Sequence, residues 1–244
     1  MEDIKEKYFM AVEDVLRRIR ETQFESISKA AEKVADTAMK GGVVHLFGTG
    51  HSFLVCQEAH LKAGGLACCH AVMECNLIGR SMESMHLERL EGYGKVIFQR
   101  VNVTENDTVV VVSGSGVNPA PIEFALEGKE RGLPVIAITS INFSRNAPSR
   151  HPTGKRLFEV ADIVVDSCVP LGDAVIEVKG TPQKVGPVST IAMMTIVETI
   201  IVQAVEKMVE RGFEPPIFLS ANIPGGDKHN LSLINRYKAK IPYG

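Results

Sequence analysis

Two short runs of the sequence combine glycine with hydroxyl-bearing residues in a pattern that suits a phosphate ligand. The first is Phe47-Gly48-Thr49-Gly50-His51-Ser52, and the second is Ser113-Gly114-Ser115-Gly116-Val117-Asn118. Glycine lets the backbone approach a ligand closely, and the N-terminus of a following helix attracts an anion. The predicted phosphate-binding residues are therefore Gly48, Thr49, Gly50, Ser52, Ser113, Gly114, Ser115, Gly116 and Asn118.

A single turn of this kind is weak support, because many strands enter helices through glycine. Two such turns, about 65 residues apart, are stronger support. Gly48-Thr49-Gly50 lacks the third glycine of a dinucleotide-binding turn, and neither run carries the lysine of a P-loop. The pattern favours a phosphorylated small molecule held by hydroxyls, backbone amides and helix dipoles.

The elements that must position these runs read as strands alternating with helices. Apolar runs at residues 43–47, 67–73, 108–112, 134–139 and 161–166 predict buried strands. Helical patterns occupy residues 53–63, 121–131 and 189–210, and residues 174–178 are a sixth short strand candidate. This alternation predicts an α/β fold with three layers, in which a parallel sheet is covered by helices on both faces. In such a sheet, ligands bind beyond the carboxyl ends of the strands.

The flanking segments lead us to expect three parts: an N-terminal helical segment (1–40), a phosphate-binding domain (41–212) and a C-terminal arm (213–244). Apolar stripes at helical spacing occur twice within the first forty residues, and Gly41-Gly42 ends the second helix. Residues 76–104 show no clear pattern. Prolines and the Gly225-Gly226 pair indicate that the last thirty residues form an ordered arm without a helix. This arm could lend His229 or neighbouring polar side chains to a site.

Composition narrows the class of protein. Apolar residues make up 45% and charged residues 23% of the 244 residues, and the net charge is -2, which gives no basic surface for nucleic acid. No stretch approaches about 18 consecutive apolar residues, so we expect no membrane span. The charged N-terminus lacks the apolar core of a signal peptide, and five cysteines read as reduced thiols. These features predict a cytoplasmic protein.

A metal cluster is the alternative reading of the segment that holds Cys68, Cys69, His70 and Cys75. Adjacent residues on a strand point to opposite faces, and no pair of cysteines has CxxC spacing. We therefore interpret these residues as core side chains, and we predict neither a metal nor a cofactor.

Taken together, the two glycine-rich runs resemble the sugar isomerase (SIS) domain. The resemblance extends over about residues 40–210, and it includes Gly132-Leu133-Pro134 before a strand, Ala161-Asp162 before the next, and Ser189-Thr190 at the start of a long helix. Within that family the chain looks like the uncharacterised UPF0309 group. The resemblance implies a five-stranded parallel sheet, a sugar phosphate as ligand, and a homodimer or dimer of dimers whose sites lie near the subunit interface.

An aldose–ketose isomerase is the activity that this resemblance favours. Such a reaction needs a general base beside C1 and C2 and an acid that opens the ring. The candidates are Glu58, His60 and His51, of which His51 lies at the expected ligand face. Phosphoheptose isomerases carry His and Glu zinc ligands on the helix after the first run. Those positions are Glu58 and Lys62 here, so the resemblance does not extend to the zinc site.

Two other functions remain open at this point. Leu90-Glu91-Gly92 and the second run are similar to N-acetylmuramic acid 6-phosphate etherases, which makes Glu91 the counterpart of a catalytic glutamate. Their other glutamate falls at Lys62, so that correspondence is incomplete. A binding-only sensor is the third possibility, although forty N-terminal residues are too few for a DNA-binding domain. The loop residues Arg145, Arg150, His151, Lys155 and Arg156 could contact an anionic group, and Glu198 could face the site or a second subunit.

Overall fold

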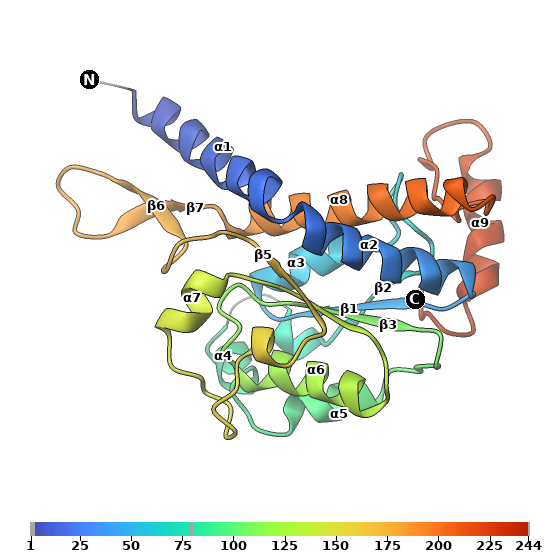
Figure 1. The fold of residues 1–244 in the computed structure, drawn as a ribbon, viewed down its shortest axis with the longest axis horizontal. Helices are drawn as coiled ribbons and strands as arrows, with labels where there is room; N and C mark the ends of the chain where they lie inside the picture. Colours follow the sequence, from blue (N-terminus) through green and yellow to red (C-terminus); the bar gives the residue numbers. More distant parts are fainter. Residues whose placement is uncertain (1–2, 79–80, 244) are drawn as a thin grey trace.

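A computed structural model describes residues 3–78 and 81–243 and confirms the predicted α/β fold. Figure 1 shows a central five-stranded parallel sheet with helices on both faces. Its strands lie in the order β2-β1-β3-β4-β5. They are β1 (Val44–Gly48), β2 (Cys69–Ala71), β3 (Thr108–Val112), β4 (Val135–Thr139) and β5 (Ile163–Asp166).

Alternate side chains of the strands build two separate cores. In β1, Val44 and Leu46 join the core beneath α2 (Phe24–Met39), α3 (His51–Glu58) and α8 (Ser189–Glu210). Phe47 points to the opposite core, where its ring stacks on Phe124 with a centroid distance of 4.2 Å. Helices α5 (Tyr93–Gln99) and α6 (Pro119–Glu130) cover that face. The sheet is therefore buried on both sides, as its continuous apolar strands require.

The N-terminal helices share the first of these cores. Helix α1 (Ile4–Thr22) is followed by Gln23 as its C-cap, and α2 packs along α8. The first turns of α1 extend away from the sheet and contact a projecting hairpin formed by β6 (Ala174–Glu177) and β7 (Lys184–Pro187) (Figure 1). The Tyr8 hydroxyl donates a hydrogen bond of 2.9 Å to the Pro187 carbonyl. The sixth strand candidate is thus a strand, but it pairs only with β7 and lies outside the main sheet.

Two regions differ from the expectations. Residues 76–104 contain the end of a 3-10 turn, η1 (Cys75–Leu77), and two short helices, α4 (Met82–Leu87) and α5. Helices of six or seven residues present too few turns for a readable apolar stripe. Their ends are stabilised by particular contacts: Ser81 and Ser84 form a reciprocal capping box at the start of α4.

The C-terminal segment also contains a helix, α9 (Gly226–Tyr237), so the prediction of an arm without a helix was wrong. Gly225 adopts a left-handed conformation at φ 84° and starts the helix, while Leu233 and Tyr237 are buried. The glycines that suggested a loop are the start of this helix. The segment lies beside β2 at the edge of the sheet, where the Tyr243 hydroxyl donates to the Ala67 carbonyl over 3.1 Å. Residues 1, 2 and 244, at the ends of the predicted segments, lie outside the described residues.

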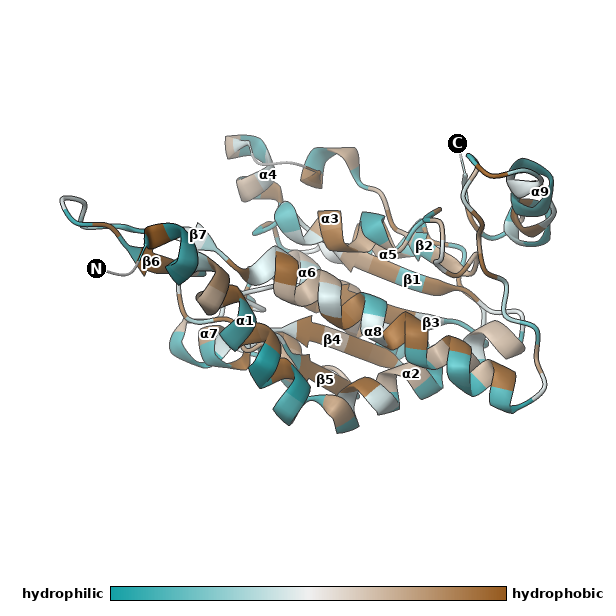
Figure 2. Ribbon diagram, turned by 90° about the horizontal axis from the view of Figure 1, so that it is seen from above, coloured by the Kyte–Doolittle hydropathy of each residue, from teal (hydrophilic) through white to brown (hydrophobic). Residues whose placement is uncertain are grey.

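Helix α8 has the length and mean hydropathy of a membrane-spanning helix, the only one to do so in the part of the chain that the structure describes. The expectation that no stretch comes close to this limit was therefore too strong. In the structure, eight residues of α8, including Ile196 and Ala204, are buried in the core beneath α2 and α3. Figure 2 shows this apolar helix lying along the sheet. The remaining short elements are α7 (Ile141–Asn146) and η2 (Leu157–Glu159).

Candidate functional site

The strand order places the two glycine-rich runs side by side. The chain leaves β1 toward β2 on one side and leaves β3 toward β4 on the other, so the connections diverge between β1 and β3. Such a switch point opens a crevice at the carboxyl ends of the strands. Gly48 pairs with Val112, which means that the β1 loop (residues 48–52) and the β3 loop (residues 113–118) begin at the same level.

A cavity of about 560 Å³ opens where these loops meet. Its volume lies within the range of small-molecule sites. Both loops and the start of α8 line this cavity. Further lining residues come from the segment before α5, the segment after α7 and the two ends of the β6–β7 hairpin. The polar lining residues are Thr49, His51, Ser52, Glu88, Arg89, Ser113, Ser115, Asn118, Arg150, Asp173, Ser189 and Thr190.

The β3 loop turns its hydrogen-bond acceptors into the protein. The carbonyls of Gly114, Ser115, Gly116 and Val117 accept hydrogen bonds from Ser140 N–H, Ser144 Oγ, Leu157 N–H and Arg150 N–H, at 2.5 to 3.1 Å. Among the described residues, the N–H groups of Ser115, Val117 and Asn118 have no such partner. Gly116 makes this path possible, since it adopts φ +63° and a Cβ there would lie 2.6 Å from Ser144 Oγ. The loop thus offers donors without competing acceptors, which is the arrangement that binds an anion.

The β1 loop has a different set of partners. Gly50 adopts φ 56° at the start of α3, and its N–H donates to the Leu77 carbonyl over 2.9 Å. The Thr49 hydroxyl donates to Glu88 Oε2 over 2.8 Å. Ser52 lines the cavity at half-buried depth and His51 lies exposed at its rim. One of the predicted phosphate ligands, Thr49, therefore already donates its proton to a carboxylate.

The helix N-termini contribute less than the sequence suggested. In the first turn of α6, Pro119 and Pro121 carry no N–H, and Ala120 N–H donates to the Glu88 carbonyl over 3.1 Å. The expectation that α6 presents free N–H groups to a ligand was therefore wrong, although its dipole remains. At the start of α8, the Asp173 carboxylate accepts from Val188 N–H, Ser189 N–H and Ser189 Oγ, at 2.6 to 2.9 Å.

Two arginines give the cavity positive charge. Arg150 lies at the cavity, and its Nη1 donates to Asn118 Oδ1 over 2.9 Å. Arg89, the residue after Glu88, lines the cavity from the segment between α4 and α5. Neither arginine forms an ion pair with another described residue. Of the basic loop residues that the sequence singled out, Arg150 alone lines the cavity, whereas Arg156 donates to the Ser144 and Ala147 carbonyls.

Four of the five predicted catalytic residues do not line this cavity. Glu58 forms an ion pair of 2.6 Å with Lys62 and faces a separate pocket beside Glu198. His60 Nδ1 donates to the Cys69 carbonyl over 3.0 Å, and His229 Nε2 donates to the Ile217 carbonyl over 2.8 Å. Burial, with the nearby Glu58 charge, raises the pKa of Glu198. Glu58, His60 and His229 thus have structural partners at other places in the fold, and His51 is the candidate that reaches the cavity.

Glu91, the fourth of those residues, is exposed beside the start of α5. Gly92 begins that helix at φ 84°, and the Glu123 carboxylate accepts the N–H groups of Gly92 and Gly94 at 2.6 and 2.9 Å. The Glu91-Gly92 pair therefore lies at the start of α5, where Gly92 caps the helix. Glu88, three residues earlier, is the glutamate that the sequence reasoning missed. It is 5% exposed and lines the cavity. One glutamate among several in an unpatterned segment gave no signal of its burial.

The cysteine- and histidine-containing edge strand builds a buried polar cluster outside the cavity. His45 Nδ1 and His70 Nδ1 are 3.0 Å apart, and His45 Nε2 lies 3.3 Å from Asp107 Oδ2. Burial, together with the neighbouring His45 and His60, lowers the pKa of His70 to about 3. Within residues 3–78 and 81–243, no three His, Cys, Asp or Glu side chains are placed to hold a metal ion.

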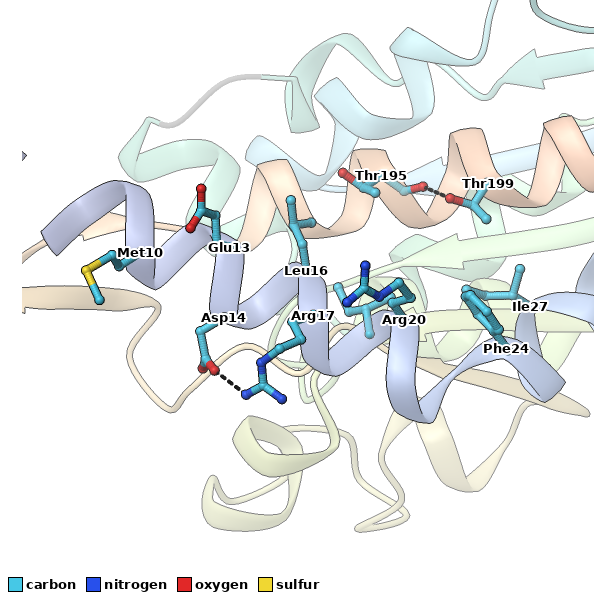
Figure 3. Close-up of a pocket in the computed structure, with 11 residues that line it drawn as sticks. Met10, Glu13, Asp14, Leu16, Arg17, Arg20, Phe24, Ile27, Thr195 and Thr199 are labelled. Carbon is cyan, nitrogen blue, oxygen red and sulfur yellow. Dashed lines mark hydrogen bonds and ion pairs between the residues drawn. The ribbon is translucent and has the colours of Figure 1, made fainter. Parts of the chain in front are cut away.

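A larger groove, of about 730 Å³, lies between α1, α2 and α8 (Figure 3). Its lining includes Met10, Leu16 and Phe24, and its Asp14 and Arg17 side chains pair with each other at 2.6 Å. The groove contains no glycine-rich loop and no unpaired cluster of donors. It is therefore a surface of mainly apolar helix faces, unlike the polar cavity.

Comparisons with known proteins agree with this geometry. The model of the SIS domain family matches residues 7–140. A UPF0309 protein of Halalkalibacterium halodurans is 38% identical over 237 residues, covering 96% of this chain and 95% of its own. A UPF0309 protein of Caldanaerobacter subterraneus is 38% identical over 238 residues, covering 94% and 97%.

Solved structures share the fold at low sequence identity. The Vibrio vulnificus NanR protein complexed with ManNAc-6P is 15% identical, with a TM-score of 0.54 over 96% of this chain and 69% of that one. A phosphoheptose isomerase from Neisseria gonorrhoeae is 18% identical, with a TM-score of 0.51 over 82% and 94%. At these identities the likeness concerns the fold alone.

Proposed function

The chain belongs to the SIS-domain family, within its UPF0309 group, and from this premise we propose that the cavity binds a phosphorylated sugar. The β3 loop is the observation that carries the proposal. Its carbonyls are engaged by the protein, and the donors that remain include the Ser115 hydroxyl and the backbone N–H groups of Ser115, Val117 and Asn118. We place the phosphate there, with Arg150 and Ser52 beside it, because charge-assisted hydrogen bonds from such groups are strong.

The sugar would then extend toward the β1 loop, where His51 and Glu88 line the cavity. A histidine and a glutamate are the usual groups for opening a sugar ring and moving a proton between neighbouring carbons. We therefore propose an aldose–ketose isomerase. This choice draws support from the fold shared with a phosphoheptose isomerase, an enzyme that isomerises a sugar phosphate.

The two alternatives differ in what supports them. An etherase-type lyase drew on Glu91, which does not line the cavity, so the geometry gives it less support than the isomerase. A binding-only protein keeps the support of the fold shared with NanR, which was solved with ManNAc-6P. Turnover separates this last function from the isomerase.

The test is a thermal-shift panel, followed by turnover. Fructose 6-phosphate, glucose 6-phosphate, sedoheptulose 7-phosphate and N-acetylmannosamine 6-phosphate are compared with their unphosphorylated counterparts. A ligand at 100 times its Kd stabilises the folded state by about 2.7 kcal/mol, which raises Tm by several degrees. If phosphorylated and unphosphorylated sugars act alike, the proposal is wrong. Appearance of the isomeric sugar by NMR then distinguishes an isomerase from a binding protein.

We also propose that the chain assembles as a homodimer or a dimer of dimers. Exposed apolar side chains along the groove, such as Phe24 at 60% and Met10 at 48%, favour burial against a second subunit. Sedimentation measurements test this assembly, and a monomer at all concentrations would contradict it. A cytoplasmic location without nucleic-acid or membrane partners stays a prediction.

A further inference from the structure

Glu88 is a buried carboxylate at the point where the two glycine-rich loops meet. It is 5% exposed and lines the cavity, and its Oε2 accepts a hydrogen bond of 2.8 Å from the Thr49 hydroxyl of the β1 loop. A buried carboxylate is costly unless it has partners, and Glu88 has them, Thr49 among them. Its position at a ligand-sized cavity makes this carboxylate a candidate for the chemistry of a bound sugar.

The backbone of Glu88 is held from two sides. Its N–H donates to the Ser84 carbonyl over 3.0 Å, and its carbonyl accepts from Ala120 N–H over 3.1 Å. Ser84 belongs to the capping box of α4, and Ala120 to the first turn of α6. These bonds attach the residue to both neighbouring elements. The backbone of Glu88 is therefore held by α4 and α6, and its carboxylate accepts a hydrogen bond from Thr49 of the β1 loop.

Thr49 has one hydroxyl proton, and that proton is donated to Glu88. A hydroxyl has a single donor, so Thr49 cannot donate to a phosphate while this bond is made. The residue that looked like a phosphate ligand in the sequence is better explained as a group that orients a carboxylate.

We propose that Glu88 is the general base of the sugar-phosphate reaction and that Thr49 is its positioning residue, an inference that rests on the function proposed above. In the open-chain aldose, Glu88 takes the proton from C2. The C–H electron pair becomes the C1–C2 double bond, and the carbonyl O1 takes the displaced π pair together with a proton from an acid. Glu88 then returns its proton to C1 as O2 loses its own proton and becomes the ketone oxygen. No oxidant or reductant takes part.

The acid of this scheme is assigned to His51, which lies at the rim of the same cavity. A histidine can give a proton to O1 and recover one from O2 as a general acid and base. Glu58, His60 and Glu91 have no part in these steps, because they do not line the cavity.

The experiment measures carbon-bound hydrogen exchange. Wild-type protein is incubated in D2O with each phosphorylated sugar of the panel, and deuterium at C1 and C2 is followed by NMR. Glu88→Gln keeps the acceptor for Thr49 but cannot take a proton. Its exchange rate should fall by at least about 100-fold, the lower end for loss of a general base. Its Kd for the sugar phosphate, from the thermal-shift titration, should change by less than about 3-fold, since the phosphate donors lie in the β3 loop.

Thr49→Val and Thr49→Ser test the positioning role. Thr49→Val should slow exchange while leaving Kd within about 3-fold, because the carboxylate loses the hydrogen bond that orients it. Thr49→Ser keeps the hydroxyl and should restore the rate. A residue that merely filled space would not give this rescue, because serine lacks the methyl group that valine keeps. Glu83→Gln, an exposed glutamate in the first turn of α4, is the matched control and should behave as wild type.

Three outcomes would overturn the proposal: unchanged exchange in Glu88→Gln, loss of exchange in Glu91→Gln but not in Glu88→Gln, or no exchange by wild-type protein with any sugar phosphate that binds. In each case binding itself survives, so the proposed phosphosugar site would stand while the role of Glu88 would fall. If no phosphorylated sugar binds, the proposed function fails first. Elimination from the substrate that depends on Glu88 would keep the base and reassign the reaction to a lyase.

Discussion

The loop after β1 and the loop after β3 leave neighbouring strands at the same level, and each follows a buried strand with glycine and a hydroxyl. Their polar groups nevertheless have different partners. In the β3 loop, four carbonyls are engaged by the protein body and the donors remain for a ligand. In the β1 loop, the Thr49 hydroxyl contacts Glu88. The β3 loop is therefore the place that we propose for the phosphate of the ligand, whereas the β1 loop binds a carboxylate of the protein itself.

This difference shows that glycine and hydroxyl content alone does not assign a role. Both loops can approach a ligand, because glycine removes the Cβ that would block the backbone. The role of each loop depends on which groups its hydroxyl and backbone contact. Opposite Thr49 stands a carboxylate, whereas Ser115 has an engaged carbonyl and an unpartnered N–H among the described residues. The following changes should separate the two loops, beginning with the largest effect.

Gly116→Ala should disrupt the β3 loop most. A Cβ at φ +63° would lie 2.6 Å from Ser144 Oγ and 2.8 Å from Thr139 Oγ1, so both strain and a clash oppose it. We expect a loss of about 2 to 3 kcal/mol in the free energy of unfolding, together with loss of sugar-phosphate binding. Urea denaturation measures the first effect. Gly132→Ala is the control, because φ is +72° there and no atom lies within 4 Å. Equal losses in the two variants would argue against the close packing of the loop.

Ser115→Ala should weaken sugar-phosphate binding by about 1 to 3 kcal/mol, the value of a hydrogen bond to a charged group. The fold should be unaffected, because the packing of the β3 loop depends on backbone carbonyls. Calorimetric titration with the tightest-binding member of the panel gives the measurement. Ser232→Ala, on the exposed side of α9, provides a matched removal of a hydroxyl. Binding that does not change would move the phosphate away from this loop.

Ser52→Ala probes the β1 loop and should cost less binding energy, about 1 kcal/mol, near the lower end of the same range. Ser52 lines the cavity, but the loop to which it belongs also serves Glu88. The comparison is sharpened if Ser52→Ala and Thr49→Val differ: the first should raise Kd, and the second should lower the rate. A larger rise of Kd in Thr49→Val than in Ser52→Ala would reverse our assignment of the two residues.

Chelation should have the smallest effect. The positions that the family resemblance matches to the His and Glu zinc ligands of phosphoheptose isomerases are Glu58, the last residue of α3, and Lys62, beyond its end; they pair with each other at 2.6 Å. A carboxylate already neutralised by a lysine is a poor ligand, and a lysine is protonated at neutral pH. We expect binding and hydrogen exchange to survive incubation with EDTA and dialysis. A requirement for stoichiometric zinc would show that the helix after the β1 loop has a role that this comparison omits.

The sequence by itself determined the local elements on which the site depends. Strands β3, with its four consecutive valines, and β1, with its apolar run, could be predicted from their own residues, because burial of both sheet faces requires continuous apolar side chains. The 22-residue α8 could be predicted in the same way from its own composition. The two loops were likewise evident from glycine and hydroxyl content. The family resemblance followed from these same residues, and it is confirmed over nearly the full chain.

Only the tertiary structure decided which polar residues meet. Adjacency of β1 and β3 comes from the strand order, which brings together loops about 65 residues apart and places Glu88 between them. Glu58, His60 and His229 contact other parts of the fold, and Glu91 is exposed outside the cavity. Helix α9 starts at glycines that looked like a loop. Hydroxyls and carboxylates show no periodicity that reveals their partners. Their roles depend on contacts between residues distant in sequence, and those contacts exist only once the chain is folded.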